Sequence, residues 1–139
     1  MTTITTDGER ELAKLSVAKI QDVLLARVVV REEAARLGFS AQALTQIATA
    51  ISEMTRNVVQ HAGVAGQVRI FEIGAGGRRG LAIAVEDAGK GIADVERALS
   101  GASPGAGIPG CRKLMDEFTI RSDGSSGTAI RMVKWLPDS

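Results

Sequence analysis

Residues 40–61 read SAQALTQIATAISEMTRNVVQH, and this stretch sets the architecture expected for the rest of the chain. Ser40 suits a helix N-cap, because a serine hydroxyl can accept a hydrogen bond from a backbone N–H of the first turn. The apolar residues then recur at the three- and four-residue spacing of one helix face: Leu44, Ile47, Ala48, Ile51, Met54 and Val58. The sequence therefore predicts a long amphipathic helix that buries this stripe.

The segments on either side supply the other elements. Before this helix, the pattern predicts a strand over 11–18 and a helix over 21–37 that ends at Gly38. After it, we expect a short helical piece near 92–99, a helix over 108–117, and strands over 67–73, 80–87, 118–123 and 127–135. Helices followed by mostly hairpin-connected strands predict an α+β fold, in which helices cover one face of a mixed sheet.

Composition narrows the classes of function. The 139 residues carry 17 basic and 16 acidic side chains, so the chain lacks the positive field typical of proteins that bind nucleic acid or membrane surfaces. No stretch predicts a membrane span, and no His or Cys cluster predicts a metal site. The single cysteine, Cys111, suits a reducing, cytoplasmic compartment and the core side of a helix. The length fits one domain over 1–139, with about the first nine residues disordered.

Two polar residues lie one turn apart on the long helix. Glu53 and Asn57 are four positions apart, so their side chains share one face, away from the apolar stripe. A carboxylate and an amide oxygen placed in this way could orient a hydroxyl group or hold a hydrated Mg²⁺. For an isolated Glu-x-x-x-Asn, a solvated polar face is the simpler interpretation, so the pair gains meaning only from its context.

A carboxylate stands at the end of a predicted strand. The apolar residues of 80–87 alternate onto one face, and Asp87 continues that face. Gly89 and Gly91 would let the chain turn away and let a flat ligand approach closely. Asp87 either accepts a hydrogen bond from a ligand amino group, such as that of adenine, or caps the turn before the glycines. Both interpretations stay open at this point.

A glycine-rich segment matches G-x-G-x-x-G literally and reads Gly105-Ala106-Gly107-Ile108-Pro109-Gly110. The dinucleotide-binding interpretation fails, because that motif should follow a strand of the first βαβ unit and precede an acidic residue by about 20 positions. Two interpretations remain. The segment is either a glycine loop whose entry into a helix suits phosphate oxygens, or a plain loop whose glycines avoid strain.

The order and spacing of these motifs resemble the ATP-binding boxes of the GHKL superfamily. The matching elements are Glu53-x-x-x-Asn57, Asp87-x-Gly89-x-Gly91, Gly105-x-Gly107 and Gly127-Thr128. The resemblance covers roughly residues 10–136. The amino-acid sequences of residues 50–57 and 105–110 are most similar to those of the RsbT-type switch serine kinases of the stressosome. It implies the Bergerat fold, an α/β sandwich that holds ATP between its helices and its sheet.

The resemblance implies a phosphoryl-transfer role for the helix pair. Asn57 would bind the Mg²⁺ of Mg-ATP, and Glu53 would act as the catalytic base that accepts the proton of the attacking hydroxyl group. Phosphoryl transfer needs mainly positioning and charge neutralisation, so a metal ion, a lid and one carboxylate are sufficient.

The resemblance also implies an adenine pocket and a lid. Asp87 would accept a hydrogen bond from the adenine amino group, and Thr128 would contact the same side of the base. The remaining positions are glycines: Gly89 and Gly91 would shape the base pocket, and Gly105 and Gly107 would belong to the lid over the phosphates.

The size of the chain favours one branch of the superfamily. Gyrase-like and chaperone members need a second domain, and a histidine kinase needs a dimerisation helix pair that carries its phosphoacceptor histidine. The only histidine here, His61, ends the nucleotide-site helix. The resemblance therefore implies a protein serine/threonine kinase that phosphorylates a STAS-domain antagonist and works by partner switching. Two alternatives stay open: an anti-sigma factor that binds a sigma factor, and a nucleotide-binding module that activates a phosphatase through its regulatory domain.

Overall fold

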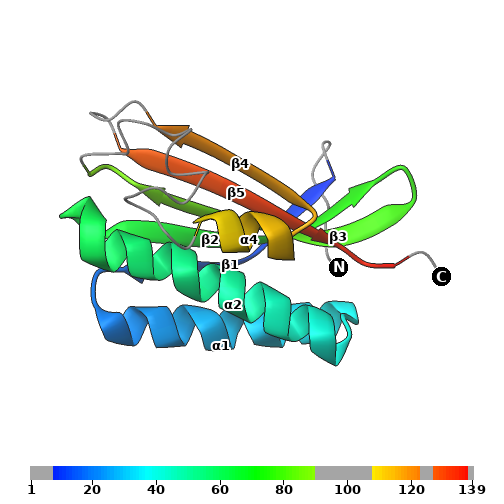
Figure 1. The fold of residues 1–139 in the computed structure, drawn as a ribbon. Helices are drawn as coiled ribbons and strands as arrows, with labels where there is room; N and C mark the ends of the chain where they lie inside the picture. Colours follow the sequence, from blue (N-terminus) through cyan, green and yellow to red (C-terminus); the bar gives the residue numbers. More distant parts are fainter. Residues whose placement is uncertain (1–7, 90–107, 123–126, 138–139) are drawn as a thin grey trace.

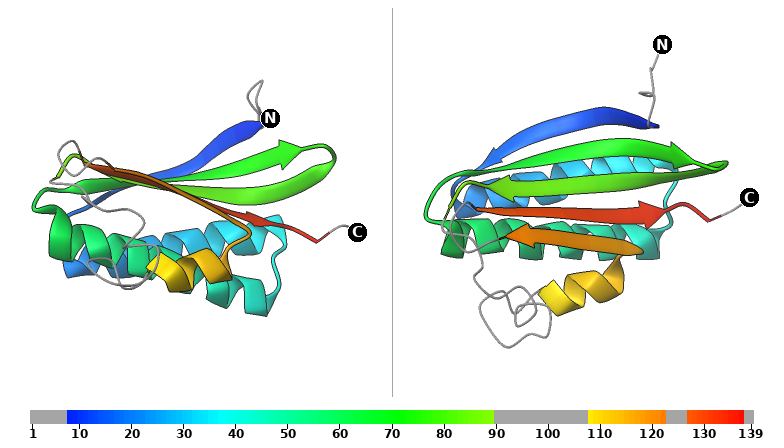
Figure 2. Two further views of the ribbon diagram at one scale, coloured as in Figure 1. Left: turned by 45° about the horizontal axis from the view of Figure 1, so that its top comes forward. Right: turned by 90° about the horizontal axis from the view of Figure 1, so that it is seen from above.

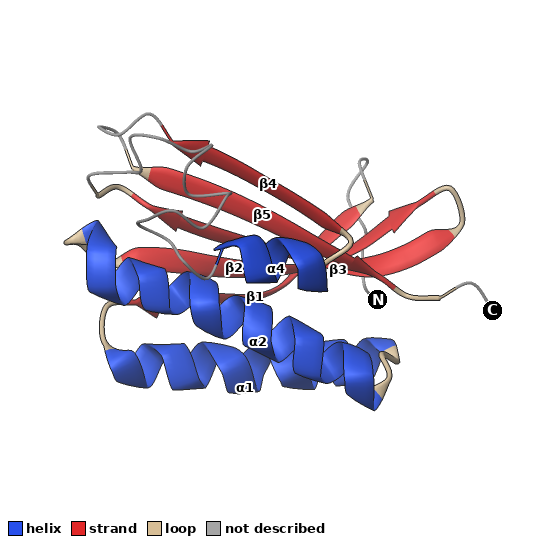
Figure 3. Cartoon of the chain, in the orientation of Figure 1, coloured by secondary structure: helices blue, strands red, loops and turns tan. Residues whose placement is uncertain are grey.

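The computed structural model describes residues 8–89, 108–122 and 127–137, which form a layer of helices against one sheet (Figure 1). The elements in chain order are β1 (Glu9–Val17), α1 (Ile20–Leu37), α2 (Ala41–Asn57), the π-helical turn η1 (Val58–Ala62), β2 (Gly66–Ala75), β3 (Arg78–Asp87), α4 (Ile108–Leu114), β4 (Glu117–Ser122) and β5 (Thr128–Trp135). The described helices all lie on one face of the sheet (Figures 2 and 3), which confirms the predicted α+β class. None of them is long and apolar enough to cross a membrane.

The five strands pair in the order β1-β2-β3-β5-β4. Every neighbouring pair is antiparallel, so the prediction of a mixed sheet was wrong in this detail. The reason is the position of β5, which lies between β3 and β4 and pairs with both. β3 and β4 run in the same direction, but β5 separates them, and no parallel pair forms in the described part of the sheet.

The two long helices begin and end close to the predicted positions. Gly38 follows α1, and its N–H donates to the carbonyl of Ala35 at 3.1 Å. Ser40 caps α2, because its hydroxyl accepts a hydrogen bond from the N–H of Ala43 at 3.2 Å. The predicted stripe of α2 enters the core, with Leu44 half-buried and the other members buried: Ile47, Ala48, Ile51, Met54 and Val58.

Several boundaries differ from the predictions. The long helix is α-helical only to Asn57, and residues 58–62 continue it as the π-helical turn η1. α4 ends at Leu114 rather than near 117, because the N–H of Asp116 donates to the Val133 carbonyl at 2.9 Å and draws the chain into the sheet. β1 begins at Glu9, so the disorder predicted for the start of the chain does not extend that far. The helical piece predicted near 92–99 lies outside the described residues.

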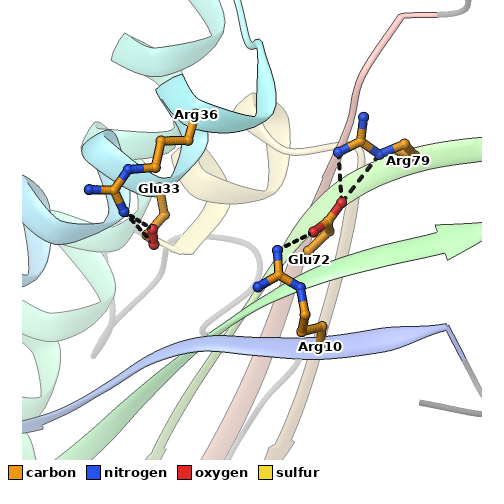
Figure 4. Close-up of polar contacts among 5 residues, drawn as sticks. All are labelled: Arg10, Glu33, Arg36, Glu72 and Arg79. Atoms are coloured by element: carbon orange, nitrogen blue, oxygen red, sulfur yellow. Dashed lines mark hydrogen bonds and ion pairs between the residues drawn. The ribbon is translucent and has the colours of Figure 1, made fainter. Parts of the chain in front are cut away.

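A buried carboxylate lies among the apolar residues of β2. Glu72 is 6% exposed and has an arginine on either side (Figure 4). Arg10 Nη2 lies 2.6 Å from one carboxylate oxygen, and Arg79 Nη2 lies 2.7 Å from the other. The hydrogen bond from Arg79 is the largest cause that lowers the pKa of Glu72, and Arg10 adds to it. Two guanidinium groups therefore compensate a charge that would otherwise be costly to bury.

We expect the Glu72→Gln variant to be less stable than the wild type by about 1–3 kcal/mol, because the arginines lose their carboxylate partner. The folded-state pKa of Glu72 lies below its unfolded-state value, so its contribution is present above about pH 4.3 and is lost as the pH falls through the folded-state pKa. Urea unfolding from about pH 7 to about pH 3 measures the difference between the two proteins. Glu11→Gln, which breaks a half-exposed pair with Arg69, is the control. A difference for Glu72→Gln that did not change with pH would contradict this account.

Candidate functional site

The strand ends place two of the predicted site residues side by side. The register of the sheet pairs Val17 with Gly66, Gly66 with Asp87, Asp87 with Thr128, and Thr128 with Ser122. These five residues therefore form one row across one end of the sheet, hereafter the strand-end row. Asp87 and Thr128 are direct cross-strand neighbours, although they are far apart in the sequence.

Asp87 closes a turn with one of its carboxylate oxygens. Its Oδ1 accepts a hydrogen bond from the N–H of Gly89 at 2.9 Å, which is the turn-capping interpretation that the sequence left open. A carboxylate has two oxygens and about four acceptor positions, so this bond leaves room for a ligand amino group. The two interpretations of Asp87 are therefore compatible, and its contact with adenine stays a prediction.

Two glycines allow close backbone contacts around Asp87. A Cβ added at Gly89 would lie 2.1 Å from the carbonyl oxygen of Ala62, at the end of η1. A Cβ added at Gly127 would lie 2.1 Å from the carbonyl oxygen of Asp87, and Gly127 has a φ of 98°. Packing alone therefore requires glycine at both positions. This requirement comes in addition to the base-pocket role predicted for Gly89.

We expect the Gly127→Ala variant to lose about 2 kcal/mol or more of stability. The alanine would be strained at this φ, and its methyl group would overlap the Asp87 carbonyl, so Asp87 and Thr128 would have to separate. Gly110→Ala is the matched control, because Gly110 lies in α4 with open space around it and alanine favours a helix by about 1 kcal/mol. Thermal denaturation compares the variants, and equal midpoints for the two would contradict the packing account.

A hydroxyl pair lies beside Asp87, and the sequence analysis missed one of its members. Thr128 Oγ1 lies 3.3 Å from Ser122 Oγ, and the Ser122 hydroxyl donates to the Gly127 carbonyl at 2.9 Å. Asp87, Ser122 and Thr128 line a pocket of about 390 Å³ together with Glu86, Ala129 and Arg121. The last three residues form the next row of the sheet, whose side chains alternate onto the face away from α2, so the pocket extends around the strand ends to that face. The pairing of β4 with β5 brings Ser122 here. The predicted strands over 118–123 and 127–135 indicated this hairpin, but the register that sets Ser122 opposite Thr128 was not predicted.

The end of α2 lies beside the strand-end row. Val58 follows Asn57 directly and packs on Gly66, where an added Cβ would lie 2.7 Å from Val58 Cγ1. Because Gly66 pairs with Asp87, the last turn of α2 approaches the same end of the sheet. Glu53 and Asn57 are both half-buried on that part of the helix. The structure thus brings the predicted helix pair and the predicted strand-end residues to one end of the molecule.

Glu53 has an ion-pair partner on its own helix. Arg56 Nη1 lies 2.9 Å from Glu53 Oε1, and the two side chains are 38% and 39% exposed. A pair this exposed is worth less than about 1 kcal/mol, so the carboxylate can exchange Arg56 for another partner at little cost. Glu53 is therefore accessible to an incoming hydroxyl group.

α4 packs against α2 one turn before Glu53. Cys111 is buried there, and its thiol donates to the Ala50 carbonyl at 3.4 Å. Burial, and to a smaller extent the charge of Glu53, raises the pKa of Cys111 to about 12. A thiol with this pKa stays protonated near neutral pH and is a poor nucleophile. The predicted structural role of Cys111 is confirmed, and α4 is held close to the predicted base.

Three predicted glycines, Gly91, Gly105 and Gly107, lie outside the described residues, and their roles stay predictions. The roles of Glu53, Asn57, Gly89 and Thr128 toward a nucleotide also stay predictions, although the structure gathers these residues around one end of the sheet.

Residues 17–134 match the family model of the histidine kinase-like ATPase domain. This chain belongs to the histidine kinase-like ATPase family. Membership of this family implies that the domain uses ATP. The match spans the strand-end row and the helix pair, so the residues gathered above all fall within the family domain.

Two relatives of known name are similar over most of their length. The chain is 40% identical over 120 residues to the serine/threonine-protein kinase RsbT of Bacillus subtilis. This matched region covers 83% of this chain and 90% of that protein. It is 33% identical over 129 residues to the anti-sigma F factor of Thermoanaerobacter sp. (strain X514), which covers 86% of this chain and 89% of the relative.

A solved structure shares the fold. It is the histidine kinase domain of the blue-light activated histidine kinase from Erythrobacter litoralis EL346, with a TM-score of 0.53 and 20% sequence identity. The similarity covers 83% of this chain and 59% of that chain, and it supports the ATPase fold alone.

Proposed function

We propose that this chain is a protein serine/threonine kinase that transfers the γ-phosphate of ATP to a STAS-domain antagonist in a partner-switching pathway. The observation that carries the proposal is the placement of Glu53, a half-exposed carboxylate one turn before Asn57 and near the strand-end row. A protein that only bound nucleotide would have no evident use for a carboxylate there. The 40% identity to RsbT, a protein named as a serine/threonine kinase, supports the same activity.

The described residues fit ATP with its metal ion. Asp87 has acceptor capacity beyond its turn bond, and the absence of a side chain at Gly89 keeps the backbone close to it. Asn57 offers an amide oxygen, and Mg²⁺ prefers oxygen ligands, usually only one or two from protein, with waters and phosphates completing its shell. Bound Mg²⁺ would neutralise charge on the phosphates. Across the described ranges no three His, Cys, Asp or Glu side chains form a metal cage, and such a sparsely held ion needs none.

In this mechanism the residues of the candidate site have separate roles. Asp87 and Thr128 orient the base and so fix where the phosphates lie. Asn57 would hold the metal ion through its amide oxygen. Glu53 leaves Arg56, accepts the proton of a serine or threonine hydroxyl on the partner protein, and thereby makes that oxygen a better nucleophile. The main contribution of the protein is to hold these groups in position.

Label transfer tests the proposal directly. The purified chain is incubated with labelled ATP, Mg²⁺ and the STAS-domain proteins encoded beside it. Label on a serine or threonine of one of these proteins is the expected result, and it would identify the substrate. ATP binding seen by calorimetry, with no label on any of them, would contradict the kinase proposal.

An anti-sigma factor is the second candidate, because the chain is 33% identical to a relative with that name. This activity predicts a stable complex with a sigma factor when ATP is bound. Size-exclusion chromatography of the mixture, with ATP and then with ADP, measures it. A sigma factor that eluted separately under both conditions would exclude this candidate for that sigma factor.

A further inference from the structure

The two hydroxyl groups beside Asp87 form a chain of hydrogen bonds that runs in one direction. The Ser122 hydroxyl donates to the carbonyl oxygen of Gly127 at 2.9 Å, and a carbonyl oxygen can only accept. The single proton of the Ser122 hydroxyl is therefore used in this bond. In the next bond, at 3.3 Å, the Thr128 hydroxyl is the donor and the Ser122 oxygen is the acceptor. One backbone carbonyl thus fixes where both hydroxyl protons lie.

This order decides what Thr128 offers to a ligand. A threonine hydroxyl has one proton and two lone pairs. Because the proton points to Ser122, Thr128 presents lone pairs to the pocket that it lines. Asp87, its cross-strand neighbour, is also an acceptor, since an ionised carboxylate has no proton to donate. Asp87 and Thr128 therefore form a pair of adjacent acceptors, hereafter the acceptor pair.

The acceptor pair faces the helices. Val85 and Ile130 are cross-strand partners two positions further into the sheet, and both are buried in the core cluster that contains Met54 of α2. Side chains two positions apart in a strand point to the same face, so the acceptor pair also points to the helical layer. Figure 1 shows the ends of β3 and β4 and the start of β5 at the end of the molecule where α2 finishes. A base seated on the acceptor pair would therefore lie between the sheet and the end of α2 that carries Asn57.

We propose that Ser122 is a positioning residue that makes the site select a purine with a 6-amino group. Two adjacent acceptors fit a group that carries two hydrogens, and the 6-amino group of adenine is such a group. A 6-oxo purine would place a carbonyl oxygen there, so that lone pairs face lone pairs. Ser122 acts through Thr128, by holding its proton away from the base. This inference rests on the nucleotide-binding roles of Asp87 and Thr128 in the proposed function.

Nucleotide selectivity tests the proposal. Inosine triphosphate has a 6-oxo group where ATP has the 6-amino group, and calorimetry with Mg²⁺ measures the dissociation constants of both. We expect the wild type to prefer ATP, and Ser122→Ala to lower this preference by about fivefold or more, because Thr128 could then turn its proton toward the oxo group. Ser122→Thr keeps the hydroxyl, suits a strand and should retain the wild-type preference. Thr119→Ala is the matched control, because it removes an exposed hydroxyl from the opposite face of the same strand.

A merely structural role of Ser122 predicts a different result. Loss of the bond to Gly127 alone would weaken the binding of both nucleotides by the same factor, and an unchanged preference in Ser122→Ala would overturn the proposal. Thr128→Val removes the hydroxyl through which Ser122 acts, so the addition of Ser122→Ala to it should leave the preference unchanged, and a further fall would overturn the proposal. So would equal affinities of the wild type for the two nucleotides. These are binding measurements, so they decide the role of Ser122 whatever the label-transfer experiment shows for the kinase proposal.

Discussion

Glu53→Gln is expected to lower phosphoryl transfer by about 100-fold or more while leaving ATP affinity within about twofold of the wild type. Glutamine has nearly the same size as glutamate but cannot take up the proton of an attacking hydroxyl. The fold should tolerate the change, since Glu53 loses only a half-exposed ion pair with Arg56. Single-turnover label transfer measures the rate, and calorimetry with Mg-ATP measures the affinity.

Arg56→Gln is the matched control for Glu53. It breaks the same ion pair and leaves the carboxylate in place, so transfer should stay close to the wild-type rate. If Glu53→Gln transferred phosphate at the normal rate, the assignment of Glu53 as the base would be wrong. If both variants lost activity equally, the ion pair itself would be the functional unit.

Asp87→Asn is expected to weaken ATP binding by about 10- to 100-fold. The asparagine Oδ1 can still accept the Gly89 N–H, so the turn should persist, but its amide nitrogen would place a donor where the adenine amino group needs an acceptor. Calorimetry with ATP measures the loss, and circular dichroism checks that the fold is intact.

Glu32→Gln is the control for Asp87, because Glu32 is an exposed carboxylate on α1 and does not line the pocket beside Asp87. It removes the same charge away from the strand-end row and should bind ATP like the wild type. An Asp87→Asn protein with unchanged ATP affinity would show that Asp87 only caps the turn.

Local patterns predicted the helices and most of the strands well. The N-cap and the apolar stripe of α2 both lie within one short, continuous segment of the sequence. Ser40 and the spacing of the apolar residues were therefore sufficient to predict where this helix lies. The same periodicity could not report that the hydrogen bonding changes after Asn57, because α- and π-helical turns bury similar positions. η1 matters for the site, since its last carbonyl, at Ala62, contacts Gly89.

Long-range pairing accounts for what the sequence did not predict. Nothing near residues 128–135 indicates that β5 enters the sheet between β3 and β4, and this placement sets Thr128 beside Asp87. The ion-pair group around Glu72 likewise joins three strands, so no single segment reveals that its charge is compensated. The family resemblance selected Asp87 and Thr128 as site residues, and the register then placed them next to each other.

The inner position of β5 has a consequence for the chain as it is synthesised. β5 is the last described strand to leave the ribosome, yet it pairs with β3 and β4 and carries Thr128 to its place beside Asp87. Until it inserts, β3 lacks a neighbour on one side and β4 lacks any described strand to join. A nascent chain therefore brings Thr128 beside Asp87 only after β5 has left the ribosome. A chain that stalls earlier exposes unpaired strand edges, which favour aggregation and chaperone capture.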